Sequence, residues 1–376
     1  MTTRALSGLD GVIASTSAIS SIEDGVLRYR GFRVEDLARH ATFEEAVFLL
    51  WDGDLPTGSS LDHLNSELRA GYALPEATER FLRRIPPTGA GVNPLSYLMT
   101  AVALLALSEP EAEETTPAAN RRKAIRLTAQ FHTAFGVLAQ ALHARERVAP
   151  DVSLSIAADL LYMVRGQPAS ASSIRALDAA LVLHADHELN ASTFAARVTA
   201  GTLSDMHSAV IAALAALKGP LHGGANRMVL EMLDEIGNVE NVEPWLDRAL
   251  SEKRRLMGFG HRVYKTGDPR AEILKQLAAE LPSSGDGARH YETARALDRA
   301  VSDRTGLLPN VDFYSAPFYE LLGLPREMYS ALFAVSRIAG WTAHIMEQYE
   351  NNRLIRPRAD YVGPGPREWQ PIGERG

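Results

Sequence analysis

Four segments of the chain combine histidine, aspartate and arginine with glycine or apolar neighbours. These side chains are the ones that general acid–base catalysis and anion binding use. In chain order the segments are HADHE (184–188), GPLHGGAN (219–226), GFGHRVYKTGDPRA (258–271) and NVDFYSAP (310–317). Taken singly, each segment also fits an ordinary structural role, so a shared function has to rest on their combination.

The two glycine-rich segments each contain one histidine. Glycines on both sides of His222 allow tight turns and a close approach of the backbone to a ligand. His261 is followed by Arg262, Lys265 and Arg270, and a basic glycine-rich loop suits an anionic ligand. Neither segment has the spacing of a dinucleotide-binding or phosphate-binding loop. A histidine in a turn and a solvated charged loop are the structural alternatives.

Asp312 lies among the apolar and aromatic residues Val311, Phe313 and Tyr314. Burial of a carboxyl group raises its pKa, because the charged form loses its hydration. A raised pKa is what a carboxylic general base needs if it is to work near neutral pH. The alternative is an aspartate that caps a helix.

The segment 184–188 contains two histidines and two acidic residues. If it were helical, His184, His187 and Glu188 would share one face. Histidine and carboxylate are zinc ligands, but the spacing is not that of the H-E-x-x-H metalloprotease motif. A buried histidine network is the preferred interpretation from these residues alone.

Two further places hold arginines. Arg337 lies inside an apolar helical stretch, where a guanidinium needs an anion as its partner, either an internal carboxylate or a substrate. Arg356 and Arg358 flank Pro357 near the C-terminus, and a basic surface tail is the alternative there.

Composition excludes several classes of protein. The net charge of −7 disfavours a nucleic-acid-binding protein, and it means that an anion site requires a local cluster of arginines. With no cysteine, there is no disulfide, thiolate metal site or cysteine nucleophile. The longest apolar run, Ala209–Leu217, is too short to cross a bilayer, and the N-terminus has no apolar signal core. These features predict a soluble, cytoplasmic protein without a membrane partner.

The elements that must position these residues are almost all helices. Short β-type runs at Val12–Ser15 and Val26–Tyr29 flank a turn and predict a small N-terminal hairpin. After it the class is all-α, with a dozen or more helices. Apolar residues recur at helical spacing in Phe43–Trp51, Pro94–Leu107, Arg122–Leu142, Ser153–Met163 and Ser204–Leu217. The last of these is so apolar that it is either a core helix or part of a subunit interface.

The ordered set of segments resembles the citrate synthase family. Besides the four segments above, the resemblance includes GVLRYRGF (25–32), SRIAGW (336–341) and RPRADY (356–361), so it covers nearly the whole chain. It implies a helical homodimer whose active site lies in the cleft between two domains. The large domain would comprise 1–222 and 324–376, and the small domain 223–323, which would carry the CoA-binding and catalytic loops.

The resemblance also implies a role for each motif residue. His222 would hydrogen-bond the carbonyl of acetyl-CoA, Asp312 would take a proton from its methyl group, and His261 would donate to the ketone of oxaloacetate. The residues implied to bind oxaloacetate are His187, Arg270, Arg337 and Arg356, the last one from the partner subunit. No metal is expected, because arginines and histidines would supply the electrophilic assistance, and no cofactor is expected, because the CoA thioester is a substrate.

The implied CoA contacts are Arg255, Leu256, Met257, Gly258 and Lys265. The backbone of 256–258 would lie near the adenine and Lys265 near a phosphate. Gly306 stands where many relatives have a lysine, which removes one expected phosphate contact.

Three other functions remain as alternatives. The nearest is 2-methylcitrate synthase, which uses propionyl-CoA and typically has YAEHE, HPVYT and NLDWFSA where this chain has HADHE, HRVYK and NVDFYSA. That comparison favours citrate, although one methylene changes binding by only about 1–3 kcal/mol. The others are a metal-dependent hydrolase built on the 184–188 segment and a helical scaffold without catalytic activity.

Overall fold

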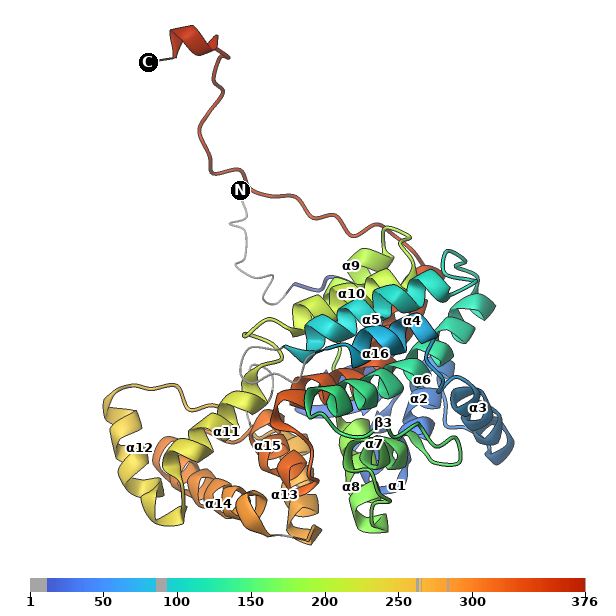
Figure 1. Cartoon of the computed structure of the whole chain (residues 1–376). Coiled ribbons are helices and arrows are strands. Elements are labelled where there is room, and N and C mark those ends of the chain that lie inside the picture. The colour runs from blue at the N-terminus through green and yellow to red at the C-terminus, as the bar shows by residue number, and fades with distance from the viewer. Residues whose placement is uncertain (1–11, 86–92, 262–263, 265, 283, 376) are drawn as a thin grey trace.

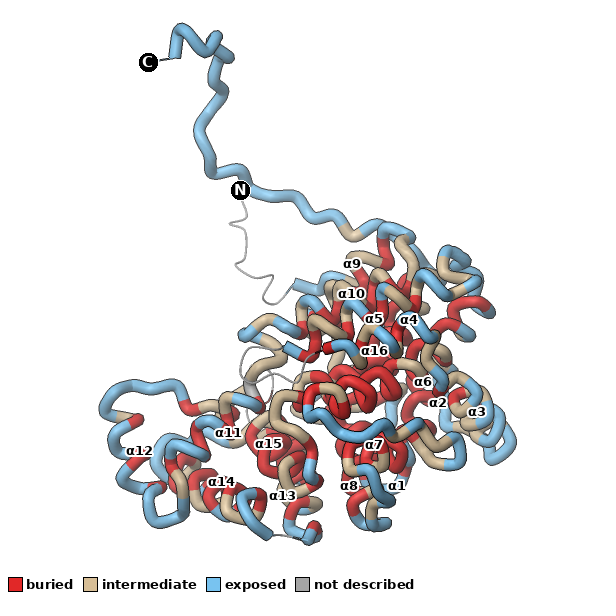
Figure 2. Tube along the Cα trace, viewed as in Figure 1, coloured by how far each residue is buried: buried red, intermediate tan, exposed pale blue. Residues whose placement is uncertain are grey.

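The computed structural model describes residues 12–85, 93–261, 264, 266–282 and 284–375. Within them the chain forms sixteen α-helices and one small sheet, as the all-α prediction expected (Figure 1). The helices gather into two groups of unequal size, and Figure 2 shows that each group has its own buried interior.

The sheet has three antiparallel strands in the order β1 (Ser20–Glu23), β2 (Val26–Tyr29) and β3 (Phe32–Arg33). The predicted strand at Val12–Ser15 is therefore wrong, and β3 was not predicted. Asp24 and Gly25 both have positive φ angles, 51° and 75°, which defines a two-residue hairpin turn. That turn pairs Val26 with Glu23, so the first strand runs back from Glu23 to Ser20.

The larger group packs around α16 (Tyr329–Glu350), a long helix that is buried over most of its length. Its apolar residues contact helices from both the early and the middle part of the chain. The other helices of this group are α1 (Val34–His40), α2 (Phe43–Asp52), α3 (Gly58–Ala70), α4 (Glu76–Arg83), α5 (Pro94–Ser108), α6 (Pro117–Leu142), α7 (Ile156–Arg165), α8 (Ala171–His184), α9 (Ala191–Ala200) and α10 (Met206–Leu217). The very apolar α10 packs on α5, α9 and α16, so it is a core helix of this group.

The smaller group consists of five consecutive helices that mainly contact one another. They are α11 (Ala225–Ile236), α12 (Val242–Ser251), α13 (Pro269–Glu280), α14 (Gly285–Thr305) and α15 (Val311–Leu321). A short 3₁₀ helix, Arg326–Met328, leads back from α15 to α16. Helices α11 to α15 lie within the predicted small domain, whose boundaries at 223 and 323 stay a prediction.

Three helices begin at polar residues that belong to the motifs. The side chain of Asn190 accepts backbone N–H bonds at the start of α9, Asp268 does so for α13, and Asn310 for α15. Such N-caps satisfy backbone donors that the first turn leaves free, typically for about 1 kcal/mol. These caps fix the points at which the loops before α9, α13 and α15 end and the helices begin.

The chain leaves the helical body after α16. Residues 351–375 run outward as an exposed segment with one short 3₁₀ helix, Ile372–Glu374 (Figures 1 and 2). None of the described helices combines the length and the apolarity that crossing a bilayer would require.

Candidate active site

A cavity of about 980 Å³ is lined by six of the seven residues predicted for catalysis and oxaloacetate binding. It is bordered by the N-terminal segment, by the loop after α8 and by the smaller helix group. The predicted residues that line it are His187, His222, His261, Arg270, Asp312 and Arg337. Arg356 of the same chain lines a different cavity, of about 850 Å³, beside the exposed C-terminal segment.

His187 lies on a loop, so the face that His184, His187 and Glu188 would share on a helix does not form. Helix α8 ends at His184, whose buried Nδ1 donates to the carbonyl of Ala180 at 2.7 Å. The two histidines therefore point to different places, and only His187 lines the cavity. In the described part of the chain, no three His, Asp or Glu side chains are grouped as a metal site would need.

The ring of His187 contacts the smaller helix group through Tyr264. His187 Nε2 and Tyr264 Oη are 3.1 Å apart and share a hydrogen bond, and the rings of His187 and His261 are 5.6 Å apart. Burial, and then the positive charges of Arg270 and Arg337, hold the pKa of His187 well below its usual range. His187 is therefore a neutral imidazole at physiological pH.

His261 is placed by two loops that pair with each other. Gly260 N–H donates to the carbonyl of Leu308, and Asn310 N–H donates to the carbonyl of Gly258, both at 2.8 Å. Gly258 has a φ of 78°, and a Cβ there would lie 2.7 Å from the Cβ of Phe313, so only glycine fits. This pairing brings His261 next to the start of α15, where Asp312 lies.

The hydrogen bonding of His261 defines its tautomer. Its Nδ1 accepts the backbone N–H of Tyr264 at 3.1 Å. In the neutral ring the proton must then be on Nε2, because an accepting nitrogen carries none. His261 can thus present Nε2–H to an acceptor in the cavity.

His222 is held by a serine. Its Nε2 lies 2.9 Å from the hydroxyl of Ser192, which also bonds to Asn190 Oδ1 at 2.7 Å and receives the indole N–H of Trp341 at 3.2 Å. Burial, followed by the charge of Arg337, lowers the pKa of His222 to about 4. The ring is neutral at pH 7, and its Nδ1 is free of these contacts.

Asp312 lies in the first turn of α15, where its backbone N–H donates to Asn310 Oδ1 at 3.1 Å. Burial raises the pKa of its carboxyl to about 6, although Arg270 and Arg337 act in the opposite direction. Asp312 itself is partly buried, and its neighbours Val311, Phe313 and Tyr314 are buried. A carboxyl with this pKa is mostly ionised at pH 7 and still accepts a proton readily.

Arg270 forms a two-pronged ion pair with Asp268. Its Nε and Nη2 donate to the two carboxylate oxygens at 3.0 and 2.9 Å, and both residues are buried. Asp268 also accepts the backbone N–H of Val311 at 3.0 Å, which ties this pair to the helix of Asp312. One carboxylate thus orients the guanidinium and leaves Nη1 available to a ligand.

Arg337 is fully buried among apolar residues of α16. Its Nε donates to the carbonyl of His184 at 2.7 Å, and its guanidinium lies over the ring of Phe333 at 4.5 Å. Burial lowers its pKa to about 10, so it remains charged at pH 7. In the described part of the chain its two Nη atoms have no hydrogen-bond partner, and Arg337 borders the cavity.

The predicted CoA-binding residues Arg255, Leu256, Met257 and Gly258 do not line this cavity. Arg255 is exposed, whereas Leu256 and Gly258 are buried and Met257 is partly buried. Lys265 lies outside the described residues. Gly306 ends α14 with a φ of 71°, and open space surrounds the position of its missing Cβ.

Four residues that matter to this geometry carried no weight in the sequence prediction: Ser192, Tyr264, Asp268 and Trp341. Each of them acts by contacting a predicted site residue, so its residue type alone does not indicate a functional role. Asp268 is the exception, because an Asp-Pro pair before a helical pattern signals an N-cap close to Arg270.

Histidines that are neutral, a carboxyl with a raised pKa and two buried arginines around one cavity define an enzyme site for an anionic substrate. A family model described as citrate synthase, C-terminal domain, matches residues 8–358. The chain belongs to the citrate synthase family.

Individual relatives cover almost the entire chain. Citrate synthase 2 of Bacillus subtilis is 46% identical over 368 residues, 98% of each chain. 2-Methylcitrate synthase 2 of Corynebacterium glutamicum is 40% identical and covers 100% of this chain and 99% of its own. A solved ternary complex of citrate synthase from Thermoplasma acidophilum with carboxymethyl coenzyme A and oxaloacetate has a TM-score of 0.90 at 39% identity, with 98% of both chains covered.

Proposed function

We propose that the protein is a citrate synthase, which condenses acetyl-CoA and oxaloacetate with water to citrate and CoA, the entry step of the tricarboxylic acid cycle. The observation that carries this proposal is the placement of Asp312. A carboxyl with a pKa of about 6 borders the same cavity as the neutral His222 and the donor His261.

The first step removes a proton from the methyl group of the thioester. This proton is weakly acidic, so Asp312 needs help from a donor at the thioester oxygen, where negative charge develops. His222 is suited to that task as a neutral electrophile. In the structure the single proton of Ser192 is donated to Asn190 Oδ1, so the neutral His222 donates from Nε2 to Ser192 Oγ. The proposed role therefore requires the Ser192 proton to turn to His222 Nε2, which places the imidazole proton on Nδ1.

The second step joins the new nucleophilic carbon to the ketone carbon of oxaloacetate. His261 donates its Nε2 proton to the ketone oxygen as the carbon–carbon bond forms, a role that its hydrogen bond from Tyr264 N–H supports. Arg270 and Arg337 bind the two carboxylates, and His187 completes the oxaloacetate site. Hydrolysis of the resulting citryl thioester then releases CoA.

All of these steps use protein side chains as acid, base and anion ligands. The proposal therefore includes neither a metal nor a resident cofactor, and CoA enters as part of the substrate. The segment from Arg255 to Gly258, with Lys265, is proposed to receive the nucleotide end of CoA.

We further propose a homodimer in which Arg356 of each chain completes the partner's oxaloacetate site. In its own chain Arg356 lines a cavity other than that of Asp312. It lies on the outward-running C-terminal segment, where Tyr361, Val362, Trp369 and Ile372 are 76–91% exposed. Apolar side chains on an extended arm favour burial against a second subunit.

Propionyl-CoA is the main rival acyl donor, because a 2-methylcitrate synthase is nearly as similar to this chain as the citrate synthases are. The deciding experiment measures release of the free CoA thiol from acetyl-CoA and from propionyl-CoA, each with and without oxaloacetate. We expect oxaloacetate-dependent release with a higher kcat/KM for acetyl-CoA. A higher kcat/KM for propionyl-CoA would make the protein a 2-methylcitrate synthase. CoA release that does not depend on oxaloacetate would exclude both synthase activities.

A further inference from the structure

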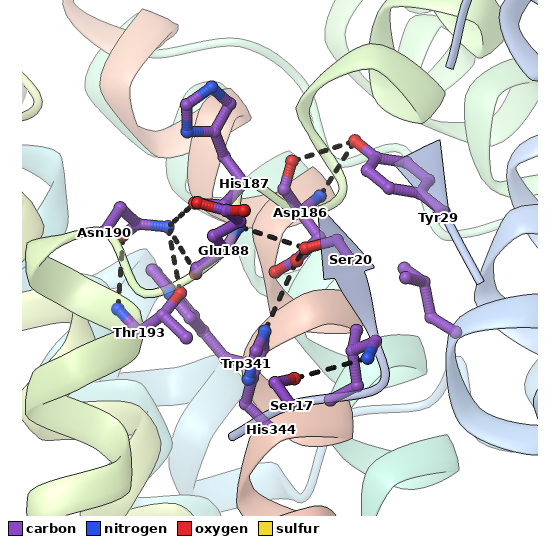
Figure 3. A network of polar contacts seen from close by, with 12 residues as sticks. Ser17, Ser20, Tyr29, Asp186, His187, Glu188, Asn190, Thr193, Trp341 and His344 are labelled. Carbon is purple, nitrogen blue, oxygen red and sulfur yellow. Dashed lines mark hydrogen bonds and ion pairs between the residues drawn. The ribbon is translucent and has the colours of Figure 1, made fainter. Parts of the chain in front are cut away.

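The hydroxyl of Ser20 in strand β1 contacts both neighbours of His187. It donates to the carboxylate of Asp186 and accepts the backbone N–H of Glu188, the latter at 3.0 Å. The directions of these bonds are unambiguous, since an amide N–H only donates and the serine has a single proton. One small side chain thus bridges the residues before and after His187 (Figure 3).

Strand β2 holds the same loop from the same side. Tyr29 lies directly opposite Ser20 in the hairpin register, so the two side chains are on one face of the sheet. The phenol of Tyr29 donates to the carbonyl of Asp186 at 2.9 Å and accepts its N–H at 3.1 Å. The hairpin therefore fixes both the main chain and the side chain of Asp186.

The backbone of this loop is in a conformation that needs such support. Glu188 has a φ of 48°, in the left-handed region that costs a residue other than glycine roughly 1 kcal/mol or more. Its side chain accepts the backbone N–H of Ile22 in β1 at 2.7 Å. Two bonds from β1, one to the main chain and one to the side chain, hold Glu188 in place.

Asp186 is fully buried, and the bond from Ser20 is one of few that it receives. His344 Nε2 donates to the same carboxylate oxygen at 3.3 Å, while Nδ1 of His344 accepts a bond from Arg197 at 3.1 Å. The other carboxylate oxygen has no partner in the described part of the chain. Loss of the serine hydroxyl would leave this buried charge with one long hydrogen bond, which favours movement of the loop.

The ring of His187 takes no part in this network and points away from it (Figure 3). It reaches the cavity and the phenol of Tyr264 instead. The network thus fixes the backbone on either side of His187 and leaves its imidazole for the ligand.

We propose that Ser20 is a positioning residue for oxaloacetate, which sets the direction of His187 by bridging Asp186 and Glu188. The inference rests on the proposed function, in which His187 binds oxaloacetate. It gives the N-terminal hairpin a role in substrate affinity in addition to its packing on the larger helix group.

The first test is the steady-state kinetics of Ser20→Ala. We expect the KM for oxaloacetate to rise about tenfold, the KM for acetyl-CoA to stay within about twofold, and kcat to fall less than the oxaloacetate KM rises. Ser20→Thr keeps the hydroxyl and should restore the oxaloacetate KM to within about threefold of the wild-type value. An unchanged oxaloacetate KM in Ser20→Ala, or equal losses in Ser20→Ala and Ser20→Thr, would overturn the proposal.

Ser153→Ala is the matched control. Ser153 also donates to an aspartate carboxylate, that of Asp151, but it is exposed and does not line the cavity. It should behave as wild type, and thermal melts of all variants show whether Ser20→Ala remains folded. If Ser20→Ala does not fold, the test uses the oxaloacetate KM of Ser20→Cys and Ser20→Thr instead. Cysteine is a weaker hydrogen-bond donor, so Ser20→Cys should raise this KM, whereas Ser20→Thr should not.

A double-mutant cycle with His187→Ala tests whether Ser20 acts through His187. In the His187→Ala background, Ser20→Ala should change the oxaloacetate KM by less than about twofold. Additive effects would contradict the proposal. The wild-type assay separates the two hypotheses: if wild type shows no oxaloacetate-dependent CoA release, the proposed function fails, whereas a normal wild type with an unaffected Ser20→Ala rejects only the positioning role.

Discussion

The cavity is built from two sides that are held in different ways. On the side of the larger helix group, the segment 186–192 is fixed by side chains from distant parts of the chain, such as Ser20, Tyr29, Trp341 and His344. On the side of the smaller group, His261 and Asp312 are placed by backbone bonds between residues 258–260 and 308–310. Tyr264 joins the two sides through its bond to His187.

The geometry of the two sides therefore depends on the fold in different ways. The geometry of the first side needs the hairpin, α9 and α16 to be packed together, because its hydrogen bonds run between them. The second side depends on glycines and caps that are close in space and belong to one helix group. Mutations on the first side should therefore mainly affect oxaloacetate affinity, and those on the second side mainly the rate of the chemical steps.

The largest effect is expected from Asp312→Asn on the second side. It removes the proposed base, so CoA release should fall by about 10³-fold or more, while oxaloacetate binding by calorimetry stays within a few-fold of wild type. Loss of oxaloacetate binding in parallel with activity would contradict the separation of the two sides.

The same variant should be more stable than wild type. The raised pKa of Asp312 means that its protonated form favours the folded state, and this contribution is lost as the pH rises through about 6. At pH 7 the buried charge is therefore a cost, and the neutral amide should raise the free energy of unfolding by about 1–3 kcal/mol. Denaturant titrations at pH 5 and pH 7.5 should show the larger gain at pH 7.5.

The pH profile provides the next largest effect. The rate should fall by about tenfold per pH unit below pH 6, because Asp312 must be ionised to act as a base. His222, with its pKa of about 4, stays neutral over this range and should not contribute. A profile of kcat/KM for acetyl-CoA that remains flat down to pH 5 would rule out the assigned base.

Tyr264→Phe cuts the hydrogen bond between the two sides and keeps the ring. We expect a rise of about five- to tenfold in the oxaloacetate KM, since His187 loses its partner, and a smaller fall in kcat. Titration of oxaloacetate at saturating acetyl-CoA measures both. Wild-type values would show that the sides are coupled by other means.

The smallest effect is expected outside both sides, at the exposed Arg255. Arg255→Ala should raise the KM for acetyl-CoA by about two- to threefold and leave the oxaloacetate KM unchanged, as removal of one exposed charged contact to CoA would. The outcome that contradicts the predicted CoA contact is an unchanged KM for acetyl-CoA.

Much of the fold could be predicted from apolar spacing. The helices at Phe43–Asp52, Pro94–Ser108 and Met206–Leu217 agree with the periodic segments to within a few residues. The first strand was misplaced because Val12–Ser15 has the right residue types, whereas the register is fixed by the turn at Asp24 and Gly25. The sequence did not indicate where the helix before His187 ends; α8 ends at His184, and the loop that follows is held by hydrogen bonds from Ser20 and Tyr29 of the hairpin.

By itself the sequence determined which residues are suited to chemistry: His187, His222, His261, Arg270, Asp312 and Arg337 all border one cavity. Residue types and the order of the motifs are properties of the sequence, so they indicate candidate residues without any knowledge of distances in space. Only the tertiary structure decided protonation and direction. The pKa of Asp312 arises from burial, and the hydrogen bonds of Ser20 to Asp186 and Glu188 join residues far apart in the chain, so no local pattern encodes either of them. The tautomer of His261 follows from the conformation of its own loop, in which Nδ1 accepts the N–H of Tyr264.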